Sequence, residues 1–184
     1  MIEMQRRALY IPVLHIDANL INARQKLPFV NQLKKWAKDE IICINMSSIA
    51  RKEARAGSNT NRIRKADEQL HTLTPPPEAN NPDYKFVEAI IFPEGAKNEN
   101  QQNDIKIILE AKRYAAILVA ADGGSKKQPG GILGNREKLK DMLTIFSPDE
   151  AVDFVRSKIK ERDDFNMRVA KEFGGELPEW TGKD

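Results

Sequence analysis

Short, nearly continuous apolar runs alternate along this chain with longer stretches in which apolar residues recur every three or four positions. The runs at residues 9–16, 40–44, 86–92, 116–121 and 142–146 are typical of strands whose two faces are both covered. The stretches with helical spacing lie between them. Because strands alternate with helices, we expect an α/β fold with three α/β/α layers and a mostly parallel central sheet.

Capping residues and prolines predict where the helices begin and end. We expect one helix from Pro28 to about Lys38, and a second that Ser47 or Ser48 caps and that Gly57-Ser58-Asn59 interrupts. Residues 72–83 and 93–103 are rich in proline or in polar side chains, which predicts exposed loops. The second of these loops is expected to end where Asn103 and Asp104 open another helix.

The C-terminal part predicts further helices. Ser147-Pro148-Asp149-Glu150 combines a serine cap, a first-turn proline and a glutamate three residues after the cap. A final helix over residues 165–173 is expected to stop at Gly174-Gly175. We therefore expect a main domain over residues 1–150 and a helical extension over residues 151–184 that packs on it. The tail after residue 174 has two alternatives, disorder or docking on a second copy in a homodimer.

Composition narrows the class of protein. The chain has 184 residues, of which 40% are hydrophobic and 31% charged, so we expect a globular protein with a heavily charged surface. A single cysteine, Cys43, excludes a disulfide framework or a cysteine zinc site, and its apolar neighbours predict a buried thiol. No apolar run approaches the ~20 residues of a membrane span. We expect a soluble, cytoplasmic protein that makes no membrane contact.

Four acids stand where strands or helices end. Asp17 and Asp122 each close an apolar run, Glu53 follows the second expected strand, and Asp104 precedes a helix that leads back to Asp122. Carboxyl ends of parallel strands meet at one edge of a sheet, where ligands bind, and crowded carboxylates repel one another unless a cation neutralises them. Oxygen ligands suit Mg²⁺ or Mn²⁺, and such ions support hydrolysis of a phosphodiester. The sequence therefore predicts a divalent-metal site.

Two of these acids also have ordinary structural interpretations. Asp104 fits an acid that the helix dipole favours near a helix N-terminus. Glu53 fits a surface glutamate that pairs with Arg51 or Arg55.

Basic residues surround the expected acidic pocket. Because the formal net charge is +3 even with these acids included, the rest of the surface is basic and suits a polyanionic substrate. The stretch after the second strand predicts contacts to a nucleic-acid backbone from Arg51, Lys52, Arg55 and Arg62. The segment Gly123-Gly124-Ser125-Lys126-Lys127 lacks the spacing of a nucleotide-binding P-loop. Its lysines, Lys126 and Lys127, are expected to form a flexible basic flap over the site.

Three segments, in this order along the chain, resemble the PIN-domain family of Mg²⁺- or Mn²⁺-dependent nucleases. Residues 16–21 are similar to the family's opening D-x-N-x-[LVI] motif, residues 48–53 to its helix-borne glutamate, and residues 104–122 to its acid, helix, strand, acid module. The resemblance covers roughly residues 9–150. It implies a PIN-like fold in which the metal-binding and catalytic acids are Asp17, Glu53, Asp104 and Asp122. It further implies that Asn19 assists the first acid and that Ser125 substitutes weakly for a polar residue after the last one.

The function that this resemblance implies is a metal-dependent endoribonuclease acting on structured or single-stranded RNA. One alternative keeps the nuclease but makes it the toxin of a toxin–antitoxin pair, with an antitoxin protein as partner. Another is a binding or scaffold protein on a degenerate PIN fold. That alternative is motivated by Ala120, where family members often have Ser or Thr, and by Gly123-Gly124, where many have an acid or Asn soon after the last acid.

Overall fold

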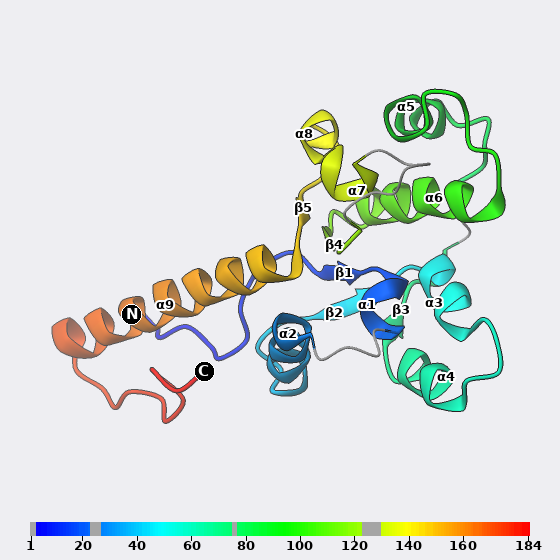
Figure 1. Cartoon of the computed structure of the whole chain (residues 1–184). Helices are drawn as coiled ribbons and strands as arrows, with labels where there is room; N and C mark the ends of the chain where they lie inside the picture. Colours follow the sequence, from blue (N-terminus) through cyan, green and yellow to red (C-terminus); the bar gives the residue numbers. More distant parts are fainter. Residues whose placement is uncertain (1–2, 23–26, 75–76, 123–129) are drawn as a thin grey trace.

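A short parallel sheet lies at the centre of the fold (Figure 1). Its five strands lie in the order β3-β2-β1-β4-β5, and each of the described pairs is parallel. The structure is a computed structural model that describes residues 3–22, 27–74, 77–122 and 130–184. The strands are β1 (Leu14–Ile16), β2 (Ile44–Met46), β3 (Leu70–His71), β4 (Ile117–Val119) and β5 (Ile145–Phe146).

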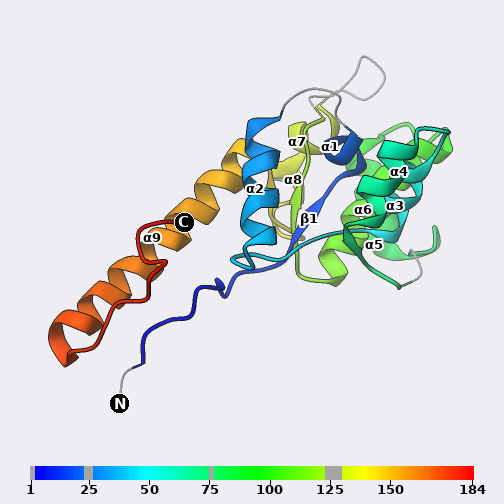
Figure 2. The same cartoon turned by 90° about the horizontal axis from the view of Figure 1, so that it is seen from below.

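Helices cover both faces of this sheet, which confirms the predicted α/β fold with three α/β/α layers. In Figure 2, α2 (Pro28–Lys38) and α9 (Pro148–Phe173) lie on one side of β1, and α3 (Ser48–Arg55), α5 (Pro82–Ile91) and α6 (Glu99–Arg113) lie on the other. The shorter helices are α1 (Ala18–Asn22), α4 (Thr60–Asp67), α7 (Gly131–Gly134) and α8 (Arg136–Leu139).

The hydrophobic core fills the space between the sheet and these helices. Leu14, Leu118 and Val119 of the central strands are fully buried. Helix α2 has the predicted bounds, and its inner face buries Val30, Leu33 and Trp36 at helical spacing. Both neighbours of β1 and both layers of helices exclude water from it, which explains why its run is continuously apolar.

The direction of strand succession changes at β1. The chain passes from β1 outward to β2 and β3 on one side, and later adds β4 and β5 on the other. In open α/β sheets, ligands bind at the carboxyl ends of the strands where the order reverses in this way. Here that place lies between β1 and β4, where the Asp17 N–H donates to the Val119 carbonyl at 3.1 Å.

Two segments that the sequence predicts as strand and loop are helical. Helix α5 occupies most of the run 86–92, because Asn81 caps it, Pro82 fits its first turn, and Tyr84, Val87 and Ile91 bury one helical face. A short apolar run alone does not distinguish a buried strand from a helix.

Helix α6 begins earlier than predicted. It starts at Glu99, where the Asn98 side chain accepts a hydrogen bond from the Gln101 N–H at 3.0 Å. Asp104 therefore lies in the second turn of α6, so its interpretation as an acid at the helix N-terminus is wrong.

The strands are shorter than the apolar runs that predict them. Strand β2 begins at Ile44 rather than at residue 40, so Cys43 precedes the strand. Its thiol is exposed, and the prediction of a buried thiol is wrong.

The two helices predicted after residue 147 form the single helix α9. Its start has the predicted capping box between Ser147 and Glu150, and its end is followed by Gly174 at φ +75°, as predicted. Helix α9 contacts α2 and β5, and it runs through residue 150. The division into residues 1–150 and 151–184 stays a prediction.

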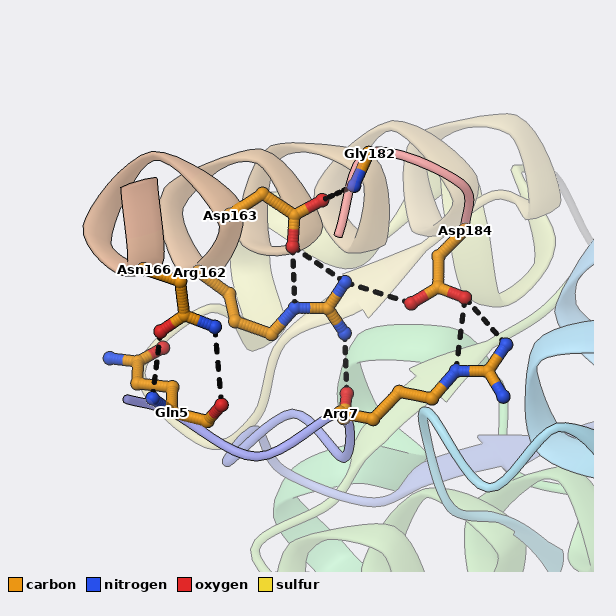
Figure 3. A network of polar contacts seen from close by, with 7 residues as sticks. All are labelled: Gln5, Arg7, Arg162, Asp163, Asn166, Gly182 and Asp184. Atoms are coloured by element: carbon orange, nitrogen blue, oxygen red, sulfur yellow. Dashed lines mark hydrogen bonds and ion pairs between the residues drawn. The ribbon is translucent and has the colours of Figure 1, made fainter. Parts of the chain in front are cut away.

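Both terminal segments fold back along α9 (Figure 3). Asn166 of α9 exchanges two hydrogen bonds with the backbone of Gln5, at 2.7 and 3.2 Å. The Arg162 guanidinium lies 4.2 Å from the centre of the Trp180 ring. The tail after residue 174 therefore docks on its own chain, and its docking on a second copy in a homodimer stays a prediction.

Charged groups join the two segments to α9 in a network that we call the Arg162 clamp, made of Arg7, Arg162, Asp163 and Asp184. Arg162, 2% exposed, pairs with Asp163 and Asp184 at 2.8 Å each. Asp184 also pairs with Arg7 at 2.6 Å. Burial tends to raise the pKa of Asp184, but the hydrogen bonds and charges of Arg7 and Arg162 outweigh it and hold the pKa below its ordinary value.

In the described parts of the chain, no helix combines the length and the apolar composition needed to cross a membrane.

Candidate active site at the carboxyl edge of the sheet

Asp17 is the first residue after β1 and is 8% exposed. Its Oδ1 accepts a hydrogen bond from the Ala18 N–H at 2.6 Å, and its carbonyl accepts one from the Leu20 N–H at 3.1 Å. The turn from β1 into α1 therefore fixes both the backbone and the side chain of this acid at the switch point of the sheet.

Asp122 follows β4, the neighbour of β1 at the switch point. Its Oδ2 accepts a hydrogen bond from the Ile132 N–H at 2.8 Å, at the start of α7. Its Oδ1 is buried, and no partner for it lies among the residues that the structure describes. The start of α7 thus fixes the Asp122 carboxylate through Oδ2.

Gly131 allows this close approach of α7 to Asp122. It has φ +50°, and a Cβ built on it would lie 2.3 Å from Asp122 Oδ2. A side chain at this position would collide with the carboxylate.

Glu53 reaches the same region from α3. Ser47 caps α3, as predicted, by accepting a hydrogen bond from the Ala50 N–H at 2.9 Å. The half-buried Glu53 accepts a hydrogen bond at Oε1 from Asn103 Nδ2 of α6 at 2.8 Å. Arg51 and Arg55 instead pair with Asp67, so the interpretation of Glu53 as their surface partner is wrong.

The charges of both other acids act on Asp17. Burial, together with the charges of Asp122 and Glu53, raises the pKa of Asp17 to about 7, although the Ala18 N–H opposes the shift. Burial also raises the pKa of Asp122. We call the three carboxylates of Asp17, Glu53 and Asp122 the acidic edge. Within the described residues, no Lys or Arg forms an ion pair with any of them.

The other predicted site residues are distributed around this edge. Asp104 is half-buried on α6, directly after the Asn103 that contacts Glu53. Asn19 is exposed on α1. Ser125, Lys126 and Lys127 lie outside the described residues.

The four predicted backbone-binding cations that the structure describes have protein partners. Arg51 and Arg55 pair with the same oxygen of Asp67, at 2.9 and 3.1 Å, and the exposed Lys52 pairs with Glu99 at 3.3 Å. Arg62 turns inward and donates to the Glu53 carbonyl at 2.6 Å. Arg62 therefore braces α3 against α4 rather than facing a ligand.

Two polar residues near the edge, Asn103 and Glu110, are not predicted from the sequence as part of the site. Asn103 is 8% exposed although the sequence places it in an exposed loop. Glu110 is fully buried and accepts hydrogen bonds from the Ser48 N–H at 3.3 Å and from the Thr72 hydroxyl. Its place between Ile107 and Ala111 on α6 is the signal that could have indicated an inward position. These contacts tie α3 and the end of β3 to α6.

The acidic edge fits a hard divalent cation in its donor chemistry. Its side chains offer oxygen atoms and crowded negative charge, and Oδ1 of Asp122 has no partner among the described residues. Across the described residues, no group of three or more His, Cys, Asp or Glu side chains is arranged so that it could hold a metal ion. The acids influence one another electrostatically but do not form a closed coordination shell as they stand.

No protein-family model, no curated protein and no solved structure matches this chain. The resemblance to the PIN-domain family therefore stays a hypothesis that rests on the residues themselves.

Proposed function

We propose that this protein is a PIN-like, metal-dependent endoribonuclease that hydrolyses RNA phosphodiester bonds with Mg²⁺ or Mn²⁺ at the acidic edge. One observation carries the proposal. Asp17 is buried at the switch point of a parallel sheet, with a pKa raised to about 7 by burial and by the charges of Asp122 and Glu53. A carboxylate cluster that ionises against its own repulsion favours a cation as its ligand.

In this proposal, some residues bind the metal ion and others orient the metal-binding carboxylates. Asp17, Glu53 and Asp122 would hold the metal through their oxygens, with Asp104 as the fourth acid. A bound Mg²⁺ or Mn²⁺ supplies a more acidic water and neutralises charge on the phosphoryl oxygens. The Ala18 N–H, the Ile132 N–H and the Asn103 amide orient the three carboxylates. This orientation lowers the reorganisation needed when the ligand binds.

The test is cleavage of a labelled, mixed-sequence RNA by the purified chain in Mn²⁺. We expect Asp17→Asn and EDTA each to reduce the rate by at least ~10³-fold, because the site loses its metal. The matched control is Asp153→Asn, an exposed acid on α9 that pairs with Arg156. Cleavage that survives in Asp17→Asn would contradict the proposal.

One observation favours a second candidate, a binding or scaffold protein on a degenerate PIN fold. The described acids do not form a closed metal-holding group, and Ala120, fully buried, offers no hydroxyl beside them. This candidate predicts a folded protein that neither cleaves RNA nor gains thermal stability from Mn²⁺.

The toxin hypothesis differs from the main proposal in its partner and not in its chemistry. It requires an antitoxin protein that binds the chain and suppresses cleavage. We propose a cytoplasmic location, which would suit either kind of ribonuclease.

A further inference from the structure

A groove with a cationic wall lies along α3. It has a volume of about 620 Å³ and is bordered by α3 and the segment that follows β3. Its polar lining comes from Ser48, Arg51, Lys52, Arg55, His71 and Thr72.

The groove carries more positive charge than its partners neutralise. Arg51 and Arg55 share one carboxylate, that of Asp67, and no acidic side chain is among the described residues that line the groove. Two guanidinium groups with one shared acid leave donors and charge for an anion.

Helix α3 separates this groove from the acidic edge. Successive helical residues are turned by about 100°, so Arg51 and Arg55 lie on the face opposite Glu53. The contacts agree, because Glu53 meets Asn103 of α6 whereas both arginines meet Asp67 of α4. The two sites are therefore roughly one helix diameter apart, ~10 Å.

Lys52 lies between the two faces. Its side chain is 78% exposed, and its pairing with Glu99, itself 72% exposed, spans 3.3 Å. An exposed ion pair of this kind contributes little free energy, so a phosphate can replace the glutamate at small cost. The two arginines and Lys52 thus follow one another around α3, from the groove toward the face that carries Glu53.

We propose that this groove holds the phosphate backbone of a single-stranded RNA segment next to the segment that lies at the acidic edge. The inference rests on the proposed ribonuclease function and names the path of its substrate. Unpaired bases expose ring faces, and the groove borders offer the His71 imidazole and Leu73, which is 86% exposed, as surfaces against them.

The same contacts assign different roles to the neighbouring basic residues. Arg62 is engaged with the Glu53 carbonyl, and Arg64 pairs with Glu68 on the surface of α4. Arg64 and Lys65 do not line the groove. They provide a matched control with the same loss of two positive charges from the adjacent helix.

The experiment measures binding of a fluorescent single-stranded RNA in EDTA, over a salt series, so that cleavage plays no part. We expect Arg51→Gln/Arg55→Gln to weaken binding at least ~10-fold at low salt. The slope of log affinity against log salt should fall by about 1.4, at ~0.7 for each lost phosphate contact on a single strand. Arg64→Gln/Lys65→Gln should change the affinity less than ~2-fold, and circular dichroism should show both variants folded.

Equal binding by the groove variant and the control variant would overturn the inference, as would tighter binding of a duplex RNA of the same length. The proposed function fails separately, through absence of Mn²⁺-dependent cleavage. Binding in EDTA and cleavage in Mn²⁺ therefore distinguish a wrong substrate path from a wrong activity.

Discussion

The acidic edge and the Arg162 clamp each contain a buried aspartate, but the charges around that aspartate differ. In the clamp, Asp163 and Asp184 face Arg7 and Arg162, so two negative charges meet two positive ones. At the edge, Asp17 lies near Asp122 and Glu53, and its pKa rises to about 7. Asp184 has its pKa lowered by its arginines.

This difference separates a structural network from a candidate site. A buried charge network that is internally neutral can hold two chain segments in place. A cluster of like charges destabilises the fold unless a bound ion of opposite charge neutralises it. Replacing one charge in each region should therefore change stability in opposite directions.

The largest effect on stability is expected in the clamp. Arg162→Met leaves Asp163 and Asp184 without their central cation, which should cost about 3–5 kcal/mol and lower Tm by ~10 °C. Arg168→Met, an exposed arginine of α9, is the matched control and should shift Tm by less than ~2 °C. A clamp variant as stable as the wild type would show that the network contributes nothing.

Asp17→Asn should stabilise the metal-free protein at pH 8. The folded-state pKa of about 7 exceeds the ordinary value of 3.8, so the folded chain holds this proton more tightly. Stability should therefore fall as pH rises from about 4 to about 7. Removing the ionisable group should raise Tm by about 4–8 °C at pH 8 in EDTA and flatten this pH dependence.

Asp153→Asn provides the control, because its carboxylate is exposed on α9. A lower Tm for Asp17→Asn at pH 8, or an unchanged slope with pH, would mean that the edge does not carry the proposed electrostatic strain.

A smaller effect is expected from Asn103→Ala. The variant frees the Glu53 carboxylate from its 2.8 Å hydrogen bond, which should cost about 1 kcal/mol of stability and ~10-fold in cleavage rate. Gln102→Ala, at the exposed neighbouring position, should leave both unchanged. Cleavage at the wild-type rate by Asn103→Ala would show that Asn103 does not position Glu53.

The sequence predicts the fold well where local chemistry decides it. Ser47, Pro28 and the Ser147–Glu150 capping box mark helix ends through contacts within a few residues, and these predictions are confirmed. The predicted strand over residues 86–92 is wrong because a short apolar run suits either a strand or a helix. The segment belongs to α5, which starts at the Asn81 cap and Pro82 and packs against α6.

The candidate site divides in the same way. Asp17 and Asp122 are predictable because an acid that directly follows a buried apolar run can be recognised in the sequence. Asn103 is not predictable, because it contacts Glu53, which lies far away along the chain. Gly131 is not predictable either, because its role depends on the backbone conformation that brings it close to Asp122. The Arg162 clamp is likewise invisible, since it joins residues from both ends of the sequence.

The most direct test of the account is the effect of Mn²⁺ on Tm at pH 8 for the wild type and for Asp17→Asn. If the acidic edge is a cation site, Mn²⁺ at ~100 times its Kd should stabilise the wild type by about 2.7 kcal/mol, or ~5–10 °C. Asp17→Asn should then show little change. No shift in the wild type, or an equal shift in the variant, would contradict the claim that these acids are held together to bind a metal ion.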